Sequence, residues 1–373
     1  MSPRCAVGLA ALVLLLLPAA AQARLGLGLQ DDRLFLGPPV TSDRAAGWTV
    51  AAGLHRAQQL GVQTLKLGVP WERVVGADEG APLALSRYDE VVDAARARGL
   101  SIHLAFRGPA PSWATGDHRT SNVTPDPVAF GRFAARVGEH FRGRVAEYST
   151  WNEPNWHGHL VPLRTAGDQY RRLHVAGERA LRRSDPAALV LFGELAPLGE
   201  PEAAVAPLRF LRQATCSDRS WRAARYCAPL VADGFALHPY TLRWAPDFPG
   251  RSADDVTTGS LGRLHHPLAH LAARGALRTP KGRASMPLFL SEWGWHARSR
   301  RIPPAARSAM LARGLRLIAS DPRVREVTWY QLVSPPSLPR PPWDTGLVLP
   351  DGRPRPAFEV LRRWFAPAQA PAR

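Results

Sequence analysis

Two hydrophobic patterns alternate along this chain. Short apolar runs bounded by Gly, Pro or polar residues predict buried strands. The segments between them carry apolar residues at helical spacing, as Tyr88, Val91, Val92 and Ala95 do after Ser86. That spacing places the apolar side chains on one face and predicts an amphipathic helix, which Gly99 ends and in which Asp89 stands at the capping-box position.

The pattern predicts eight strands that alternate with helices along the chain. We expect the strands at 25–30, 64–69, 101–106, 145–151, 188–192, 234–237, 287–291 and 327–332. We expect further helices after Asp126-Pro127 and at 170–181, 261–273, 305–319 and 355–365. This order over 373 residues predicts an α/β fold, a single (β/α)8 TIM barrel. A doubly wound sheet is the competing topology, but the chain has no Gly-rich phosphate loop to support it.

The N-terminus differs from the rest of the chain. Arg4 is followed by an apolar run at 7–17 and by Ala21-Gln22-Ala23, a small-x-small cleavage site. These features predict a secretory signal peptide at 1–23, a mature barrel domain at 24–373 and a secreted protein. An uncleaved anchor is the alternative. The run is too short for an ordinary membrane span, so we expect no stable membrane insertion.

The cysteines and the charge refine this picture. Cys216 and Cys227, 11 positions apart, predict a disulfide in an exported protein, with two unpaired thiols as the alternative. The net charge is +17, and most Arg residues fall on polar helix faces. Solvated faces explain them, and attraction to an anionic polysaccharide is the other interpretation. No motif indicates nucleic-acid binding, and no clustered His or Asp set indicates a metal, so we expect neither of these, no cofactor, and a monomer.

Two glutamates carry the candidate chemistry. Glu153 follows the predicted fourth strand, and Glu292 ends the seventh. A barrel places its reactive groups at the C-terminal ends of its strands, and strands four and seven lie across from each other. Paired carboxylates facing one sugar are what hydrolysis of a glycosidic bond requires. The alternative is that both are surface residues in loops.

At these residues the chain resembles the retaining glycoside hydrolases of the clan with acid/base and nucleophile on strands four and seven. The nearest resemblance is to the cellulase-like family 5 and the β-xylosidase-like family 39, over the whole mature barrel. The motifs that carry it are Val69-Pro70-Trp71-Glu72-Arg73, Pro111-Ser112-Trp113-Ala114, Trp151-Asn152-Glu153-Pro154-Asn155, Leu237-His238-Pro239-Tyr240, Ser291-Glu292-Trp293-Gly294, Trp329-Tyr330, Trp343-Asp344-Thr345-Gly346-Leu347 and Asp351-Gly352-Arg353-Pro354.

The resemblance implies a carbohydrate substrate and a role for each site residue. Glu153 is implied as the general acid/base, which needs a raised pKa, and Glu292 as the nucleophile, which must stay ionised. Asn152 would bond the sugar 2-OH, and Tyr240 would orient Glu292. His238 is either part of the site or a core histidine satisfied by backbone groups.

Three further positions complete the predicted substrate site. Trp329 is a candidate stacking platform beneath the sugar, and Trp113 lies near a strand end; core packing is the alternative for each. Lys66 stands where the clan usually has an Arg close to the nucleophile, and Lys lacks the bidentate fork.

Two other functions remain as alternatives. A carbohydrate-binding barrel without activity is supported only by the departure at Lys66. A metal-dependent amidohydrolase would need His-x-His on the first strand, and 25–32 has none.

Overall fold

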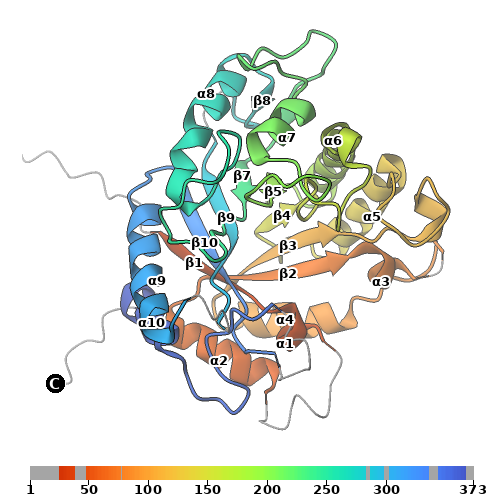
Figure 1. Cartoon of the computed structure of the whole chain (residues 1–373). Helices are drawn as coiled ribbons and strands as arrows, with labels where there is room; N and C mark the ends of the chain where they lie inside the picture. The colour runs from red at the N-terminus through yellow and green to blue at the C-terminus, as the bar shows by residue number, and fades with distance from the viewer. Residues whose placement is uncertain are drawn as a thin grey trace, which may run out of the picture.

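The computed structural model describes residues 25–37, 48–76, 78–282, 286–297, 302–335 and 343–366. Eight parallel strands close into a barrel in the order β1-β10-β9-β7-β5-β4-β3-β2, which confirms the predicted (β/α)8 fold (Figure 1). The barrel strands are β1 Gly26–Gln30, β2 Thr64–Pro70, β3 Ser101–Arg107, β4 Glu147–Ser149, β5 Leu189–Leu195, β7 Gly234–Leu237, β9 Leu288–Trp293 and β10 Val324–Tyr330. The predicted signal peptide lies outside the described residues.

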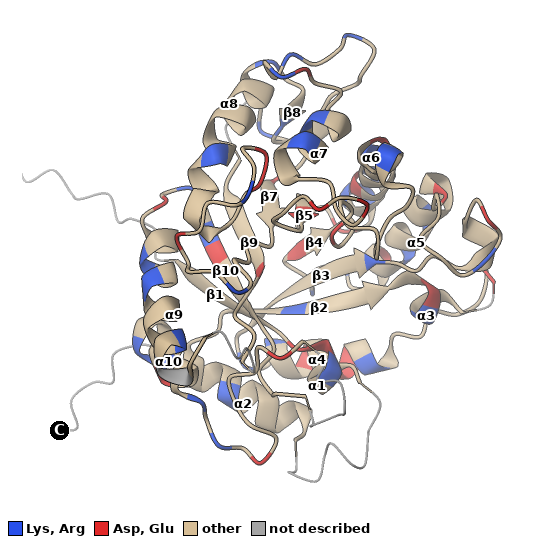
Figure 2. Cartoon of the chain, in the orientation of Figure 1, with Lys and Arg blue, Asp and Glu red and all other residues tan. Residues whose placement is uncertain are grey.

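Helices surround the barrel. The α-helices are α1 Asp32–Phe35, α2 Val50–Leu60, α3 Trp71–Val75, α4 Ser86–Arg96, α5 Pro127–His140, α6 Ala166–Ser184, α7 Pro207–Ala214, α8 His265–Ala273, α9 Pro304–Ala319 and α10 Pro356–Phe365. Short 3-10 helices are η1 Ser112–Ala114, η2 Leu163–Thr165 and η3 Thr258–Leu264. The longer helices bury an apolar face against the strands or neighbouring helices, and on their outer faces Lys and Arg are interspersed among acidic residues (Figure 2).

The local predictions hold with three corrections. The Asp126 side chain caps α5 by accepting from the backbone N–H of Ala129, as its place before Pro127 predicts. The capping box predicted at Ser86 is wrong, because Ser86 is itself the first helical residue and Leu85 is the N-cap without a side-chain bond. Strand bounds also differ from the prediction: β4 is two residues shorter at each end, β5 extends three residues further, and β10 begins three residues earlier and ends two earlier.

The third correction is a small two-stranded sheet that the pattern did not predict. It pairs β6 Leu230–Val231 with β8 Leu277–Arg278, outside the barrel. Strands of two residues are too short to produce a readable alternation.

The interior of the barrel differs from its exterior. The outward-facing strand residues join the helices in one large apolar core, whereas Leu191, Ala236 and Phe289 form a small separate cluster on β5, β7 and β9. Toward the C-terminal strand ends the interior becomes polar and charged, with residues such as Lys66 and Glu194 fully buried. A barrel interior filled with ionisable groups is costly unless the groups pair with one another.

Two irregular strands turn carboxylates into this interior. On β5, three residues from Phe192 to Leu195 span the same distance as two on β7. On β9, three residues from Leu290 to Trp293 match two on β10. An extra residue reverses the alternation of side chains after it, so Glu194 and Glu292 share the interior face with Leu191 and Phe289, respectively.

The predicted disulfide is confirmed. Cys216 and Cys227 are bonded, with their Cα atoms 6.3 Å apart, in the connection between α7 and β6. Among the described residues, no helix combines the length and the hydrophobicity that crossing a membrane requires.

We expect the double variant Cys216→Ser/Cys227→Ser to lose stability and keep its site. A cross-link closing a loop of this length stabilises a protein by about 3 kcal/mol through the entropy of the unfolded chain. Urea unfolding of the two proteins measures the loss. Mass spectrometry of the unreduced wild type that finds two free thiols would contradict the expectation.

Candidate active site

The first predicted carboxylate sits on a strained turn after β4. Glu153 has a φ of 41°, in the left-handed region that non-glycine residues rarely adopt. Two backbone bonds hold this turn: Asn152 N–H donates to Phe106 O at 2.8 Å, and Glu153 N–H donates to Glu194 O at 2.9 Å. The turn is therefore fixed by β3 on one side and by β5 on the other, and strain of this kind is commonly stored at functional sites.

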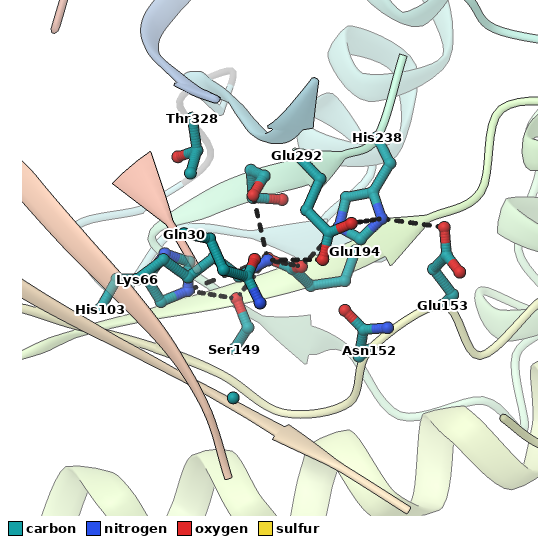
Figure 3. Close-up of polar contacts among 12 residues, drawn as sticks. Gln30, Lys66, His103, Ser149, Asn152, Glu153, Glu194, His238, Glu292 and Thr328 are labelled. Atoms are coloured by element: carbon teal, nitrogen blue, oxygen red, sulfur yellow. Dashed lines mark hydrogen bonds and ion pairs between the residues drawn. The ribbon is translucent and has the colours of Figure 1, made fainter. Parts of the chain in front are cut away.

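His238, directly after β7, joins three carboxylates (Figure 3). Its Nδ1 lies 3.0 Å from Glu153 Oε1 and 3.6 Å from Glu292 Oε2, and its Nε2 lies 2.7 Å from Glu194 Oε2. Both ring nitrogens therefore face carboxylates, and the alternative of a core histidine satisfied by backbone groups is wrong. An imidazole that donates from both nitrogens is the protonated form.

The arrangement limits how far apart the two predicted carboxylates are. One oxygen of each lies near Nδ1 of the same His238 ring. These two oxygens cannot be farther apart than the two distances placed end to end, a ceiling that is compatible with the ~5–5.5 Å separation of carboxyl groups in retaining glycosidases and just reaches the ~6.5–9.5 Å of inverting ones.

Lys66 is the second buried cation of the site. Its Nζ donates to Glu194 Oε2 at 2.6 Å and to Ser291 O at 3.1 Å, and lies 3.6 Å from Glu292 Oε1. Ser149 donates to the other oxygen of Glu194 at 2.7 Å. Lys66 therefore lies beside Glu292, as its place on the second strand suggests, but its short bond goes to Glu194. Because Lys66 is fully buried, its ammonium group contacts the two carboxylates and the Ser291 backbone oxygen and does not line the cavity.

Glu194 was not among the predicted site residues. In regular alternation it falls on the outward face of β5, and only the bulge turns it inward. The one signal in the sequence is Gly193 within the strand, because an isolated Gly in a strand often marks a bulge. Gly193 has a φ of 121° and Glu194 a φ of 53°.

The two buried cations set the ionisation of the site. Burial alone would lower the pKa of His238, but the Glu292 charge and the bonds to Glu153 and Glu194 outweigh it and raise that pKa to about 9. Burial likewise opposes ionisation of Glu194, yet Lys66 and His238 hold its pKa well below the ordinary value. His238 and Glu194 are thus both charged at neutral pH.

The two predicted catalytic carboxylates shift in opposite directions. Burial raises the pKa of Glu292, and the charges of His238 and Lys66 offset only part of this rise. Burial acts the same way on Glu153, but the hydrogen bond from His238 prevails and lowers its pKa. Glu153 by itself therefore does not have the raised pKa that we expected of the acid. The proton that Glu153 and His238 share resides on His238 instead.

Two more predicted residues contact these carboxylates. Tyr240 donates from its hydroxyl to Glu292 Oε2 at 3.3 Å, the contact expected of it. Asn152 lies 3.3 Å from His159 Nδ1 through its amide nitrogen, and His159 lies 3.6 Å from Glu153 Oε2. The roles of Tyr240 and Asn152 toward a sugar remain predictions.

A cavity of about 550 Å³ opens above the network at the C-terminal face of the barrel. Glu153, Glu292, Asn152 and Tyr240 all line it. The rest of its wall comes from strand ends and from loops after β4, β5, β7 and β10: Gln30, Asp32, Gly68, Ala105, Arg107, Trp156, His159, Ala196, Pro197, Leu198, Glu200, Ala203, Ala204, Leu242, Tyr330 and Trp343.

The two predicted tryptophans do not line the cavity. Trp329 is 3% exposed, and its Nε1 donates to the backbone oxygens of Gln331 and Thr345. Its strand neighbour Tyr330 faces the cavity instead, since successive strand residues point to opposite faces. Trp113 packs edge-on against Trp71 as part of the outer core.

Two other tryptophans supply the aromatic wall. Trp156 and Trp343 line the cavity and are each 37% exposed. Trp343 packs edge-on against Tyr240. Both lie in loops, where hydrophobic periodicity carries no information on orientation. Within the described part of the chain, no group of three or more His, Cys, Asp or Glu side chains is arranged to hold a metal ion.

Comparison with known proteins gives structural matches only. No family model and no curated protein matches the sequence. A family 39 glycoside hydrolase from the gut symbiont Bacteroides cellulosilyticus WH2 matches with a TM-score of 0.66 and 16% identity over 92% of this chain and 64% of that one. This chain therefore spans less than two thirds of that protein.

Two further solved structures match over most of both chains. A GH5_18 variant from Streptomyces cattleya, in complex with Manb1-4GlcNAc, has a TM-score of 0.60 and 19% identity over 93% of this chain and 83% of that one. A GH5-4 broad specificity endoglucanase from Clostridium acetobutylicum has a TM-score of 0.58 and 14% identity over 93% and 96%. At these identities the matches confirm the fold of the resemblance drawn from the sequence.

We expect Lys66→Met to lower the free energy of unfolding by about 3–5 kcal/mol, because it leaves Glu194 buried and without its closest cation. Adding Glu194→Gln should restore part of the loss. Urea unfolding of the four proteins of this cycle measures the coupling. The control is Arg353→Gln, which breaks an exposed ion pair with Asp351 and should cost no more than about 1 kcal/mol. If Lys66→Met lowered the free energy of unfolding no more than this control does, the expectation would be wrong.

We expect His238 to make stability depend on alkaline pH. Its folded pKa of about 9 lies above the unfolded value of about 6.5. Its contribution is therefore complete below about pH 6.5 and is lost as the pH rises through about 9. The difference in unfolding free energy between wild type and His238→Gln should shrink over this range.

The control for this measurement is His103, a buried histidine whose pKa is lowered and not raised. Burial lowers the pKa of His103 to about 3, so His103 is neutral in both states above about pH 7. His103→Gln should show a difference from wild type that stays constant from pH 7 to pH 10. A constant difference for His238→Gln as well would mean that His238 is not protonated in the folded protein.

Proposed function

We propose that this protein is a secreted glycoside hydrolase that cleaves an O-glycosidic bond of a poly- or oligosaccharide with retention of configuration. Glu292 is the nucleophile and Glu153 the general acid/base. The observation that carries the proposal is the close approach of both carboxylates to one His238 ring at the floor of an aromatic-walled cavity. This approach is compatible with the short separation, about 5–5.5 Å between carboxyl groups, that direct attack by a carboxylate requires.

In the first step, Glu292 attacks the anomeric carbon and the glycosidic bond breaks. The leaving oxygen takes a proton from Glu153, and the sugar is held as a glycosyl ester on Glu292. In the second step, Glu153 takes a proton from water, the water oxygen bonds to the anomeric carbon, and Glu292 leaves. Tyr240 and Lys66 lie against the Glu292 oxygens, where they would support the carboxylate each time it becomes free.

The Glu153–His238 pair supplies the acid in this scheme. At neutral pH the proton between them is held by His238, whose pKa is about 9. Interacting groups of this kind titrate together, so the acid is a property of the pair. The proton passes from His238 Nδ1 through Glu153 Oε1 to the leaving oxygen, which leaves His238 neutral and Glu153 ionised. The proton that Glu153 takes from water in the second step returns to His238 and restores the pair.

The cavity wall suits a sugar. Trp156 and Trp343 offer apolar ring faces to the C–H faces of a sugar ring, and Asn152 offers an amide beside Glu153. The predicted signal peptide supports secretion, and the Cys216–Cys227 bond is typical of exported proteins. A carbohydrate-binding barrel without activity is the second candidate, favoured by Lys66 in place of the usual Arg and by its stronger bond to Glu194 than to Glu292.

We expect Glu292→Gln to abolish hydrolysis and retain sugar binding, because Gln keeps the shape but cannot form the glycosyl ester. Glu153→Ala should slow substrates with poor leaving groups by about 10²–10⁴-fold and activated aryl glycosides much less in the first step. Added azide should partly rescue Glu153→Ala and yield a glycosyl azide of retained configuration. Steady-state kinetics on a panel of aryl glycosides and polysaccharides, with product analysis by NMR, measures these effects.

The matched control is Glu359→Gln, which removes an exposed carboxylate of α10 that pairs with Arg362 far from the cavity. It should hydrolyse at the wild-type rate. Wild-type rates for the Glu153 and Glu292 variants would contradict the two-carboxylate mechanism. A wild type that binds oligosaccharides and cleaves none in the panel would establish the binding barrel instead.

A further inference from the structure

We infer that Arg107 binds the carboxylate of a uronic acid residue, so that the substrate is an acidic saccharide. The inference rests on the proposed function for the cavity and names the class of sugar that the cavity takes. It is carried by an unpaired guanidinium in a cavity otherwise lined by acidic, polar and apolar groups.

Arg107 is the last residue of β3 and lines the cavity. It is the single Lys or Arg among the described residues of the cavity wall. The backbone places it beside the reactive centre, because Phe106, its neighbour in sequence, accepts the hydrogen bond of Asn152 N–H. An anion on Arg107 therefore belongs to a sugar held next to Glu153.

The guanidinium of Arg107 has no partner in the described part of the chain. Its Nε is buried without a hydrogen bond, and no ion pair of Arg107 with a carboxylate is present there. Other partly buried arginines are satisfied by backbone oxygens, as Arg136 is by Glu79 O and Ala81 O, and Arg142 by Ser184 O and Arg183 O. A buried N–H without a partner is unfavourable, and a ligand oxygen would satisfy it.

The nearest acid does not need Arg107. Asp32 lies close by, since a Cβ added at Gly68 would come 2.6 Å from Asp32 Oδ2 and 3.5 Å from Arg107 Nε. Both Asp32 oxygens already accept hydrogen bonds, one from Gly68 N–H at 2.8 Å and one from the Gln30 amide at 3.1 Å. Asp32 thus has its own hydrogen-bond partners. It accepts no hydrogen bond from Arg107, so the Arg107 N–H groups remain available to a ligand.

The other positive groups near the cavity are not available to a ligand. Burial lowers the pKa of His159 to about 4, so this ring is neutral. Lys66 and His238 are fully buried, and their protons are directed at carboxylates. Arg107 is therefore the fixed positive charge that a ligand meets in this cavity.

The chemistry of the guanidinium selects the ligand. Its planar N–H groups match the two oxygens of a carboxylate, and such paired bonds are stronger than bonds to neutral hydroxyls. A neutral sugar would offer the buried Arg107 Nε–H only a neutral acceptor in a site from which it displaces water. A uronic acid differs from its parent sugar only by a carboxylate in place of the C6 hydroxymethyl group, so it provides the missing anion without a change of ring shape.

The test measures binding in the Glu292→Gln background, where no substrate is consumed. The probes are matched pairs that differ only at C6: p-nitrophenyl β-D-glucuronide with the β-D-glucoside, and the galacturonide with the galactoside. Isothermal titration calorimetry should give at least a tenfold tighter Kd for the uronide of one pair. Arg107→Gln should abolish this preference and leave the Kd of the neutral partner within about twofold, whereas Arg107→Lys should retain part of the preference.

Each outcome decides the inference separately from the proposed function. Equal affinities within both pairs, or no binding of any probe, would overturn it, and so would an Arg107→Gln variant that weakens both members of a pair equally. Hydrolysis of neutral glycosides by the wild type, with no uronide preference, would leave the glycosidase and reject the role of Arg107. A uronide preference without hydrolysis by the wild type would keep the role of Arg107 and reject the glycosidase.

Discussion

The site depends on the balance of charge inside the upper barrel. Lys66 and His238 are fully buried and lie among Glu153, Glu194 and Glu292. Each of these ions is tolerated only because the others are present, since an unpaired buried charge costs several kcal/mol. The same pairing fixes the directions of the side chains, because a hydrogen bond between buried ions is strong and directional. The same ion pairs therefore determine both the ionisation of these side chains and their positions.

Backbone irregularity is what brings the carboxylates into this network. Glu153 and Glu194 both have positive φ, and Glu194 and Glu292 both follow bulged stretches of strand. Regular strands would keep better ladders and place these side chains elsewhere. The surrounding barrel, with its closed ring of parallel strands and continuous outer core, provides the stability that such local strain requires.

The sequence was informative where the pattern is periodic. The eight strands, most of the helices and the cap at Asp126 follow from alternation and turn chemistry, and the disulfide from an even pair of cysteines in a chain with a predicted signal peptide. Glu153 and Glu292 were found because each follows a strand in a recognisable motif. Glu194 and Tyr330 were missed and Trp329 was misplaced, because a strand with one extra residue, or a choice between adjacent residues, decides which face a side chain occupies. Trp156, Trp343 and Arg107 were missed as cavity residues because only tertiary structure brings their loops and strand end together.

The two bulges make the site separable from the fold. Each carboxylate reaches the interior through a single additional residue, so the inward positions of Glu194 and Glu292 are a matter of counting and not of composition. A strand that kept all its residues but lost the bulge would turn its carboxylate toward the helices. Loss of one residue from the stretch would instead leave Glu194 two positions after Leu191, or Glu292 two positions after Phe289, and so still on the inner face. The charge network would therefore survive a shorter, regular strand in either place, but not a straight strand of the present length.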